Sequence, residues 1–544
     1  MKKYKLLFAI PVAAIALAGC NDLDQLPYGN VLTADQKADI VENDPEMASA
    51  TVNTLPQLTS SYMSLGYDNL HTDFGWPSIM IVTDSRGMDM PSALIGYNWY
   101  TAALEWSDFG GLYYDNLIYW RTLYNLIKTS NSVAAMVDPA ATTGKLQYYR
   151  GQALGMRAWA YLNLAQMYQF TYAANPQAPT VPVLTEKNMD QAAAEGLARA
   201  TGVEIYAQIK ADLTEAIALL DKAAEQGVTR VTEAPAANYT KTFINSTVAY
   251  GLRARANLLT NDWDAAASDA QTCIDLAKKE GLDIAKSEDI SVPSFYDINE
   301  KNWIWGFYCD PQSNLVGIVG RGGQFGSFYD NYPSAGVYRL INKALYESIP
   351  SDDVRKGWWL DGKATPPRTL PSQYREWISG AVSKGMQPHP AYTQIKFGAY
   401  ENTPGTSTMS EDTPYMRVEE MYLILAEAQG MKDFGTGKTT LETFVRTRQP
   451  KYTCKATNSE ELRDAIWFQR RIELWGEGFS YHDMMRLQKP CDRRGGGFDK
   501  AVVFNVAPGD PAMIFEIVQS EAQNNPLVGN VSNGAVVPTA VPDI

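Results

Sequence analysis

NSTVAYGLRARANLLTNDWDAAASDAQTCIDLAKKEG, residues 245–281, predicts two helices joined by a tight turn. The polar run Thr260-Asn261-Asp262 supplies the turn, and Gly281 supplies a stop for the second helix. Small residues recur on both helices: Ala249, Gly251 and Ala256 on the first, and Ala265, Ala266, Ala267 and Ala270 on the second. Small side chains let helix backbones approach closely, so this unit predicts a tightly packed helical pair.

Three further segments carry apolar residues at three- and four-residue steps, as an amphipathic helix does. They are residues 148–170, 204–227 and 415–430. The 245–281 unit resembles a tetratricopeptide repeat, in which such helix pairs stack on one another. We therefore expect a mainly α fold with a base of tetratricopeptide-like helices.

Residues 282–412 have a different character from the helical segments around them. They are rich in Gly, Pro, aromatic and polar residues and show no sustained period. Such composition is typical of loops, which often carry function on a rigid scaffold. We expect an irregular, loop-rich lobe with short strands lying over the helical base.

The first 19 residues have the features of a secretory leader. Lys2, Lys3 and Lys5 precede an apolar run, Leu6 to Gly19, and polar residues follow directly. That run is shorter than the roughly 20 residues that a membrane-spanning helix needs. We expect residues 1–19 to be a signal peptide.

The end of this leader, Leu17-Ala18-Gly19-Cys20, resembles the bacterial lipobox. In a lipobox the cysteine is acylated and becomes the new N-terminus after cleavage. The resemblance implies that Cys20 anchors the protein through lipid. Residues 20–45, which are polar and acidic, are expected to form the tether that follows.

Composition limits the partners of the chain. With 61 acidic and 47 basic residues, the net charge is −14, and removal of the leader makes it more negative. Nucleic acid is therefore not expected as a partner, because binding it requires a basic surface. The chain contains 31 Tyr and 13 Trp, whose rings combine a flat apolar face with a polar edge.

Neither the cysteines nor the histidines have ligand spacing, so we expect no metal, cofactor or catalytic centre built on them. Cys20 apart, the residues concerned are Cys273, Cys309, Cys454, Cys491, His71, His389 and His482. Four cysteines allow three complete disulfide pairings, and the sequence does not choose among them.

Two short motifs are candidates for a functional site, one for nucleotide binding and one for catalysis. GTGKTT, residues 435–440, partly matches a phosphate-binding loop, but Lys432 stands where that loop needs Gly and a helix precedes it. A helix–helix turn is the better interpretation.

Glu473 and Glu477 form the second motif, because one helical turn would separate them. They could form a glycosidase pair, with two carboxyl groups across the scissile bond. A structural role is favoured, because Arg470, Arg471 and Arg486 are close enough in sequence to pair with them.

Three segments of the C-terminal part resemble the SusD/RagB family of outer-membrane lipoproteins. They are RVEEMYLILAEAQG (417–430), RRIELWGEGFSYHDMMRL (470–487) and FEIVQSEAQNNPLVGN (515–530). The matching positions are Arg417, Glu420, Ala426, Glu427, Ala428, Glu473, Leu474, Gly476, Glu477, Gly478, Asp483, Arg486, Asn525, Pro526 and Asn530. WRTLYNLIKTSN (120–131), GMRAWAYLNLAQMYQ (155–169) and SDDVRKGWW (351–359) resemble other family segments, whereas Phe468-Gln469 replaces the usual Glu-Arg.

The resemblance implies a non-enzymatic, cell-surface protein of the outer membrane. It implies a lid on a SusC-like TonB-dependent transporter that captures a nutrient oligosaccharide or polysaccharide and delivers it. The expected organisation is an N-terminal SusD-like region with tetratricopeptide-like helices over 46–281, a ligand-binding lobe over 282–412 and a C-terminal RagB/SusD region over 413–544.

Two aromatic stretches could bind such a ligand, because sugar rings stack on aromatic faces and form hydrogen bonds at their edges. They are residues 83–106 and 303–332, the regions in which the sugar sites of the family lie. The candidates are Asp84, Arg86, Asn98, Trp99, Tyr100, Tyr308, Phe328, Tyr329 and Tyr332. Large aromatic rings are often buried instead, and we expect Trp303 and Trp305 to be core residues.

Other functions stay open at this level. Some members of the family serve peptide importers, and a groove offering backbone hydrogen bonds would favour an oligopeptide as the ligand. A glycoside hydrolase would require the two glutamates to be exposed in a cleft, and a tetratricopeptide scaffold would require an open helical groove.

Overall fold

The computed structural model describes residues 34–62, 64–66, 70–96, 98–317 and 320–544. The predicted signal peptide, the lipidated Cys20 and the first part of the tether lie outside the described residues. Residues 34–45 of the expected tether are folded, which corrects that prediction. They form helix α1 (Ala34–Asn43), which packs against α5, and Val41 is buried there.

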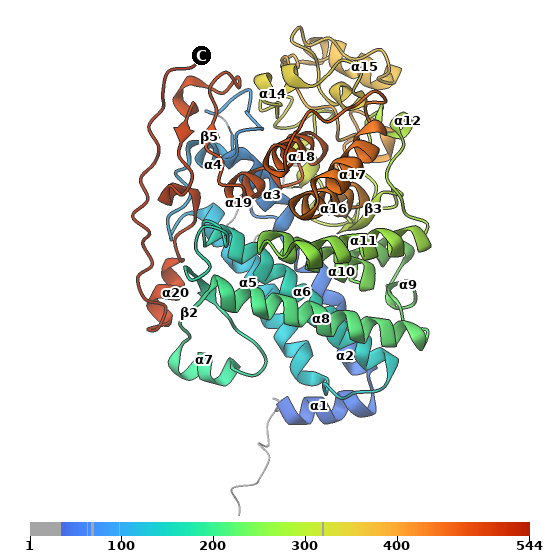
Figure 1. Cartoon of the computed structure of the whole chain (residues 1–544), viewed down its shortest axis with the longest axis vertical. Coiled ribbons are helices and arrows are strands. Elements are labelled where there is room, and N and C mark those ends of the chain that lie inside the picture. The colour runs from blue at the N-terminus through green and yellow to red at the C-terminus, as the bar shows by residue number, and fades with distance from the viewer. Residues whose placement is uncertain (1–33, 63, 67–69, 97, 318–319) are drawn as a thin grey trace, which may run out of the picture.

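A stack of helices forms the base of the molecule (Figure 1). Contacts run from α5 to α6, then to α8, α10, α11 and α16, and α16 also packs against α17 and α18. The bounds are α2 Glu46–Gln57, α5 Tyr114–Met136, α6 Gly144–Met167, α8 Gly202–Glu225, α10 Ser246–Leu259, α11 Trp263–Lys279, α16 Val418–Lys432, α17 Phe434–Arg446 and α18 Ser459–Glu473. The prediction of a mainly α, repeat-like fold is confirmed.

The helical pair predicted over 245–281 forms as expected, as α10 and α11. Asn245 caps α10 by accepting a hydrogen bond from the Val248 amide, and Asn261 adopts the left-handed conformation in the turn. Gly251 is required for the close approach, because an added Cβ would lie 2.4 Å from the sulfur of Met416. Small residues therefore set the spacing between these helices and their neighbours.

The strands are short and pair only locally in the described structure. Three antiparallel pairs occur: β1 Pro179–Pro182 with β2 Arg199–Thr201, β3 Trp303–Phe307 with β4 Thr413–Arg417, and β5 Cys491–Asp492 with β6 Asn505–Val506. The β3–β4 pair brings the two ends of residues 308–412 together, and β4 leads directly into α16. Residues 308–412, which we call the excursion, therefore leave the helical stack and return to it at α16.

The excursion is built from loops and short helices, and it lies at the top of the view in Figure 1 around α14 and α15. Its α-helices are α13 Arg321–Phe325, α14 Lys343–Ser348 and α15 Ser372–Ser379, and α12 Ser287–Ile290 lies just before β3. We expected short strands here, but β3 is the single named strand in the described residues of 282–412. A separate apolar cluster, which includes Phe328, Tyr374 and Trp377, stabilises the excursion from within.

The remaining α-helices of the described chain are α3 Trp76–Arg86, α4 Thr101–Glu105, α7 Met189–Glu195, α9 Arg230–Glu233, α19 Ser480–Arg486 and α20 Gln519–Asn524, and six short 3-10 helices lie between the elements. The C-terminal segment then runs along the side of the stack (Figure 1). Asn525 fixes it there, since its side chain accepts a hydrogen bond from the Leu197 amide and donates one to the Leu197 carbonyl. None of the described helices is long and apolar enough to cross a membrane.

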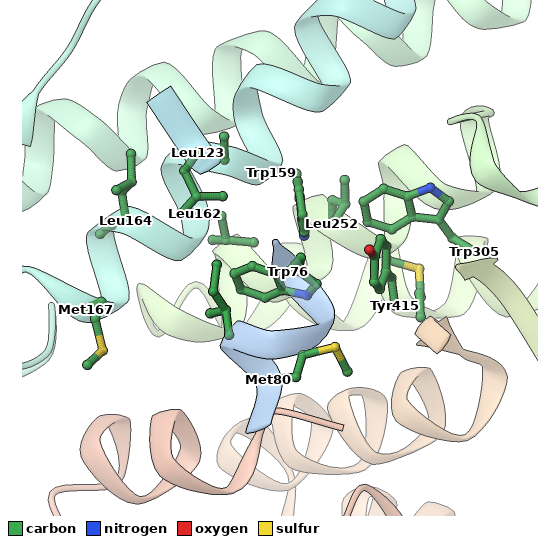
Figure 2. Packing of buried hydrophobic residues seen from close by; sticks show 14 of the residues in the cluster. Trp76, Met80, Leu123, Trp159, Leu162, Leu164, Met167, Leu252, Trp305 and Tyr415 are labelled. Atoms are coloured by element: carbon green, nitrogen blue, oxygen red, sulfur yellow. The ribbon is translucent and has the colours of Figure 1, made fainter. Parts of the chain in front are cut away.

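Aromatic side chains from distant segments meet in the centre of the core (Figure 2). The ring of Trp159 on α6 lies 4.9 Å from that of Trp76, 5.2 Å from that of Trp305 and 5.7 Å from that of Tyr415. Trp303 and Trp305 are fully buried, so their predicted core role is confirmed. Cys273, Cys309, Cys454 and Cys491 are all buried and free, which settles the open question of disulfide pairing.

Candidate functional site

Glu473 and Glu477 belong to a buried ionic cluster, which we define as these two residues with Arg355, Lys396, Arg417 and Arg448. Arg417 donates through Nε and Nη2 to Glu477 at 2.8 Å and through Nη1 to Glu473 at 3.2 Å. Lys396 Nζ lies 2.6 Å from Glu477 Oε1. Glu473 ends α18 and Glu477 lies in the following turn, so one helix does not carry both.

Burial opposes the ionisation of Glu473, but the positive charges of Arg448, Arg417 and Arg355 outweigh it and hold the pKa of Glu473 well below its usual range. Burial is likewise outweighed at Glu477, where Arg417 and Lys396 lower the pKa. A glycosidase needs one carboxyl group of raised pKa as its general acid. This pair offers none and both side chains are buried, so its role is structural.

The expected partners of this pair were wrong, although a structural role for the pair was favoured. Arg470 binds Asp483, and Arg471 binds Asp89. Arg486 binds Glu427 and Asp483. The cations of the ionic cluster come from residues 25 to 118 positions away from Glu473, a separation at which sequence proximity gives no guidance.

GTGKTT lies inside α17, so the prediction that it forms the helix–helix turn is wrong: the turn is at Asp433, just before the motif. Asp433 caps the helix by accepting from the Thr436 amide. Gly437 faces Gly430 so closely that an added Cβ would lie 2.3 Å from the Gly430 Cα. Gly437 therefore serves helix–helix contact.

The structure buries Asp84, Arg86, Tyr100, Phe328 and Tyr329. All residues of α3, which carries Asp84 and Arg86, are buried, because the helix is enclosed by other elements. Arg86 forms an ion pair with Asp108, and Asp84 accepts a hydrogen bond from the Gly478 amide. These two side chains hold the fold together and do not reach the surface.

The three buried rings are also held inside the protein. The Tyr100 hydroxyl lies 2.9 Å from the hydroxyl of Ser78. Phe328 packs 4.5 Å from the ring of Tyr374, and the Tyr329 hydroxyl accepts from the amide of Tyr400. The loop-like sequence around these rings indicated exposure, but the surrounding segments fold over them.

The remaining candidates separate into one group and one outlier. Asn98, Trp99 and Tyr332 meet at a surface hollow of about 380 Å³, which we call the aromatic hollow. Its other described lining residues are Leu70, Thr72, Gly96, Thr101, Ala102, Tyr113, Tyr114 and Asp115. Tyr308 lies instead at a second hollow of about 270 Å³, where its ring is 5.0 Å from that of Tyr239.

Trp99 is the central ring of the aromatic hollow, and 39% of it is exposed. The ring of His71 lies 4.7 Å from that of Trp99 and 5.9 Å from that of Tyr332. Nδ1 of His71 is 2.8 Å from the Tyr332 hydroxyl, within hydrogen-bond distance. Burial lowers the pKa of His71, so its ring is neutral at pH 7. These contacts hold Trp99 in place while one side of it faces solvent.

Asn98 shapes the loop that presents Trp99. Its Nδ2 donates at 3.0 Å to both the Ser92 hydroxyl and the Leu94 carbonyl. Its Oδ1 accepts from the Tyr100 amide at 3.0 Å and from Arg339 at 3.3 Å. The amide group of Asn98 is fully used within the protein, so it positions the loop and has little left to offer a ligand.

Sequence reasoning missed His71, Tyr113, Tyr114 and Asp115. Tyr113 and Tyr114 lie at the start of α5, and 37% and 45% of them are exposed. Their adjacency gave no usable signal, because Tyr148 and Tyr149, equally adjacent near the start of α6, are both buried. Their rings lie 6.2 Å apart and extend the apolar surface begun by Trp99.

The architecture and the hollow together define a class: a helical-repeat protein that presents aromatic rings on an otherwise acidic molecule. Two family models match the chain. One, a SusD-like model described as "Starch-binding associating with outer membrane", matches residues 78–243, and the model of the SusD family matches residues 379–530. The chain belongs to the SusD/RagB family.

Solved structures of similar fold cover nearly the whole chain. A SusD-like carbohydrate binding protein from Bacteroides vulgatus is 23% identical, with a TM-score of 0.69, over 90% of this chain and 97% of that one. Surface glycan-binding protein A from Bacteroides thetaiotaomicron, in complex with laminarihexaose, is 14% identical, with a TM-score of 0.61, over 91% and 99%.

A laminarin binding SusD-like protein is 16% identical, with a TM-score of 0.59, over 90% of this chain and 99% of that one. At these identities the similarity establishes a common fold. No curated protein matches the chain.

Proposed function

We propose that this protein captures a glycan at the cell surface and delivers it, as a lid, to a SusC-like TonB-dependent transporter of the outer membrane. The observation that carries the proposal is the aromatic hollow, in which Trp99, Tyr113, Tyr114 and Tyr332 surround one open space. Sugar rings present apolar C–H faces edged by hydroxyl groups, and such a lining is suited to them. Two neighbours of the same fold bind laminarin or laminarihexaose, which supports this class of ligand.

The hollow is organised before any ligand arrives, which favours binding. Trp99 contacts His71, and its loop is held by the hydrogen bonds of Asn98. Little side-chain entropy is then lost on binding, because the rings that would stack on the ligand are already in place. Exposed rings that are fixed in this way bind a ligand through surface complementarity and need no chemical step.

The membrane anchor is part of the same proposal. The lipobox-like Leu17-Ala18-Gly19-Cys20 would place a lipid at the N-terminus of the mature chain. α1 lies at one extremity of the molecule (Figure 1), so the anchored segment would enter the fold far from α14 and α15. Labelling with a palmitate analogue, with Cys20→Ser as the control, tests this anchor: label should be lost in the variant.

The test of glycan capture is calorimetric titration of the full chain with laminarin, amylopectin, galactan and mannan, and with a peptide digest. Trp99→Ala should weaken binding of the recognised glycan at least tenfold, which corresponds to about 1.4 kcal/mol. Tyr308→Ala is the matched control, because it removes a ring at the second hollow. Heat with the peptides alone would reject the glycan and favour an oligopeptide ligand.

Delivery to the transporter needs a separate measurement. The protein should co-purify from outer membranes with a TonB-dependent barrel encoded beside it, and deletion of that barrel should abolish glycan uptake without abolishing glycan binding by the purified protein. Uptake that continues without any such barrel would contradict the lid role.

A further inference from the structure

One acidic side chain lies among the rings of the aromatic hollow. Asp115, in the first turn of α5, is the single charged residue among the described residues that line it. Only 4% of Asp115 is exposed, and its Oδ2 has no hydrogen-bond partner among the described residues. A buried carboxyl oxygen without a partner is costly, and here it borders the space that a ligand would fill.

No cation compensates Asp115 within the described structure. Arg86, the positive charge that acts on Asp115, is already paired with Asp108. Arg339 is buried; its guanidinium lies 5.0 Å from the ring of Tyr100 and donates to Asn98. Asp115 therefore gains little from either arginine.

These surroundings favour the protonated form of Asp115. Burial, and then the negative charge of Asp108, raise its pKa well above the usual range against the opposing effect of Arg86. The phenols nearby do not ionise under the same conditions, since burial raises the pKa of Tyr113 to about 12 and raises that of Tyr100 as well. His71, whose ring contacts that of Trp99, is neutral for the reason given above.

We propose that Asp115 is a specificity-determining residue of this hollow, that it acts as an uncharged hydrogen-bond donor, and that it restricts the site to uncharged glycans. The inference rests on the proposed function and names the class of glycan. A protonated carboxyl group offers a donor and an acceptor side by side, which suits sugar hydroxyls. A uronate or sulfate group would have to lose water without a basic side chain among the described lining residues to compensate its charge.

The proposal fixes the sign of the pH dependence. The ligand prefers protonated Asp115, so affinity is full below the pKa of this residue in the free protein. Above that pKa the proton must be taken up on binding, and affinity falls by about tenfold per pH unit at the limit. Affinity for an uncharged glycan should therefore decline as the pH rises.

Asp115→Asn and Asp115→Ala separate this role from simple packing. Asn is nearly isosteric with protonated Asp and stays neutral, so Asp115→Asn should bind within about threefold of wild type at pH 6 and lose the decline at high pH. Asp115→Ala removes the hydrogen bond and should weaken binding about tenfold at pH 6. Glu105→Gln is the control, because Glu105 acts on Tyr113 but does not line the hollow, and its pH profile should match wild type.

The decisive experiment titrates wild type and these variants with laminarin, amylopectin, galactan and mannan from pH 5 to 10, and with polygalacturonate and alginate at pH 7. Binding of a neutral glycan, a decline that Asp115→Asn removes, and no binding of the polyuronates are expected. Three results would overturn the role of Asp115 and leave glycan capture standing. They are an affinity of wild type for the neutral glycan that does not change with pH, an equal loss of affinity at high pH in Asp115→Asn, and equal affinity for a polyuronate. Binding of no glycan at all would overturn both.

Two of these measurements use wild type alone: its affinity as a function of pH, and its affinity for neutral glycans compared with polyuronates. If Asp115→Asn fails to fold, as judged by thermal unfolding, the wild-type decline with pH and the rejection of polyuronates still decide the proposal.

Discussion

The ionic cluster and the aromatic hollow both contain residues that attract attention in the sequence, but the fold uses them in opposite ways. The cluster concentrates six charged side chains where solvent does not reach. The hollow concentrates rings at the surface and carries one carboxyl group among its described lining residues. Charge is buried for architecture here, and under the proposed function apolar surface is exposed for recognition, which reverses the usual expectation for where each belongs.

The cluster connects parts of the chain that are distant in sequence. Arg355 and Lys396 come from the excursion, Arg417 from the end of β4, Arg448 from the turn just after α17 and Glu473 from α18. Its ion pairs therefore fasten the excursion to the helical stack. The hollow lies between the loop around Trp99, the start of α5 and Tyr332 of the excursion, so the position of its rings depends on that fastening.

The largest effect is expected from Arg417→Ala. It would leave Glu473 and Glu477 buried with less than their full complement of positive charge, which should lower the free energy of unfolding by about 3 to 5 kcal/mol. Urea unfolding measures this. Arg446→Ala is the matched control, because Arg446 pairs with Glu442 on the surface of α17 and should cost no more than about 0.5 kcal/mol. Equal losses of unfolding free energy in the two variants would show that the buried and the exposed ion pairs contribute alike to stability.

Asp84, beside the cluster, predicts a pH dependence of stability. Burial raises its pKa to about 7, although the Gly478 amide donates to it. Between the unfolded pKa near 4 and about 7, the folded protein holds a proton that the unfolded chain releases, so stability falls as the pH rises through this window. Asp84→Asn should flatten this fall by about 2 to 4 kcal/mol, as measured by unfolding at pH 4.5 and pH 7.5. If the free energy of unfolding of Asp84→Asn falls with pH as steeply as that of wild type, a group other than Asp84 causes the dependence.

Glycines in the two regions should respond differently to substitution. Gly478 has a φ of +79° and an added Cβ would lie 3.0 Å from Met80, so Gly478→Ala should cost about 1 to 3 kcal/mol. Gly96 lines the hollow and has open space at the Cβ position, so Gly96→Ala should change stability by less than about 0.5 kcal/mol. Thermal unfolding of the two variants tests whether the cluster is the more constrained region.

Trp99→Ala should have a small effect on stability and a large effect on binding. Because 39% of Trp99 is exposed, its removal should lower the free energy of unfolding by less than about 1 kcal/mol, while glycan affinity falls at least tenfold. Unfolding and titration of the same preparation measure both quantities. A loss of stability as large as that of Arg417→Ala would show that Trp99 is part of the architecture after all.

Much of the helical base follows from local sequence. The small residues of 245–281, the turn at Asn261 and the burial of Trp303 and Trp305 were all predicted correctly, because helical periodicity and turn chemistry are encoded within one or two dozen residues. The same reasoning failed for residues 34–45, where a polar composition hid a helix that packs against α5. It also failed for Asp84 and Arg86, which a loop-like context placed near a ligand but which lie on the fully buried α3.

The sequence by itself determined a mainly helical, repeat-like protein with the motifs of the SusD/RagB family and with acidic, aromatic-rich composition. Only the tertiary structure decided which rings are exposed and which acids are paired. Tyr100 and Trp99 are neighbours in the chain, yet one is buried and the other borders the hollow. The physical reason is that exposure and pairing depend on segments hundreds of residues apart, such as Trp99 with Tyr332, and no local pattern encodes that contact.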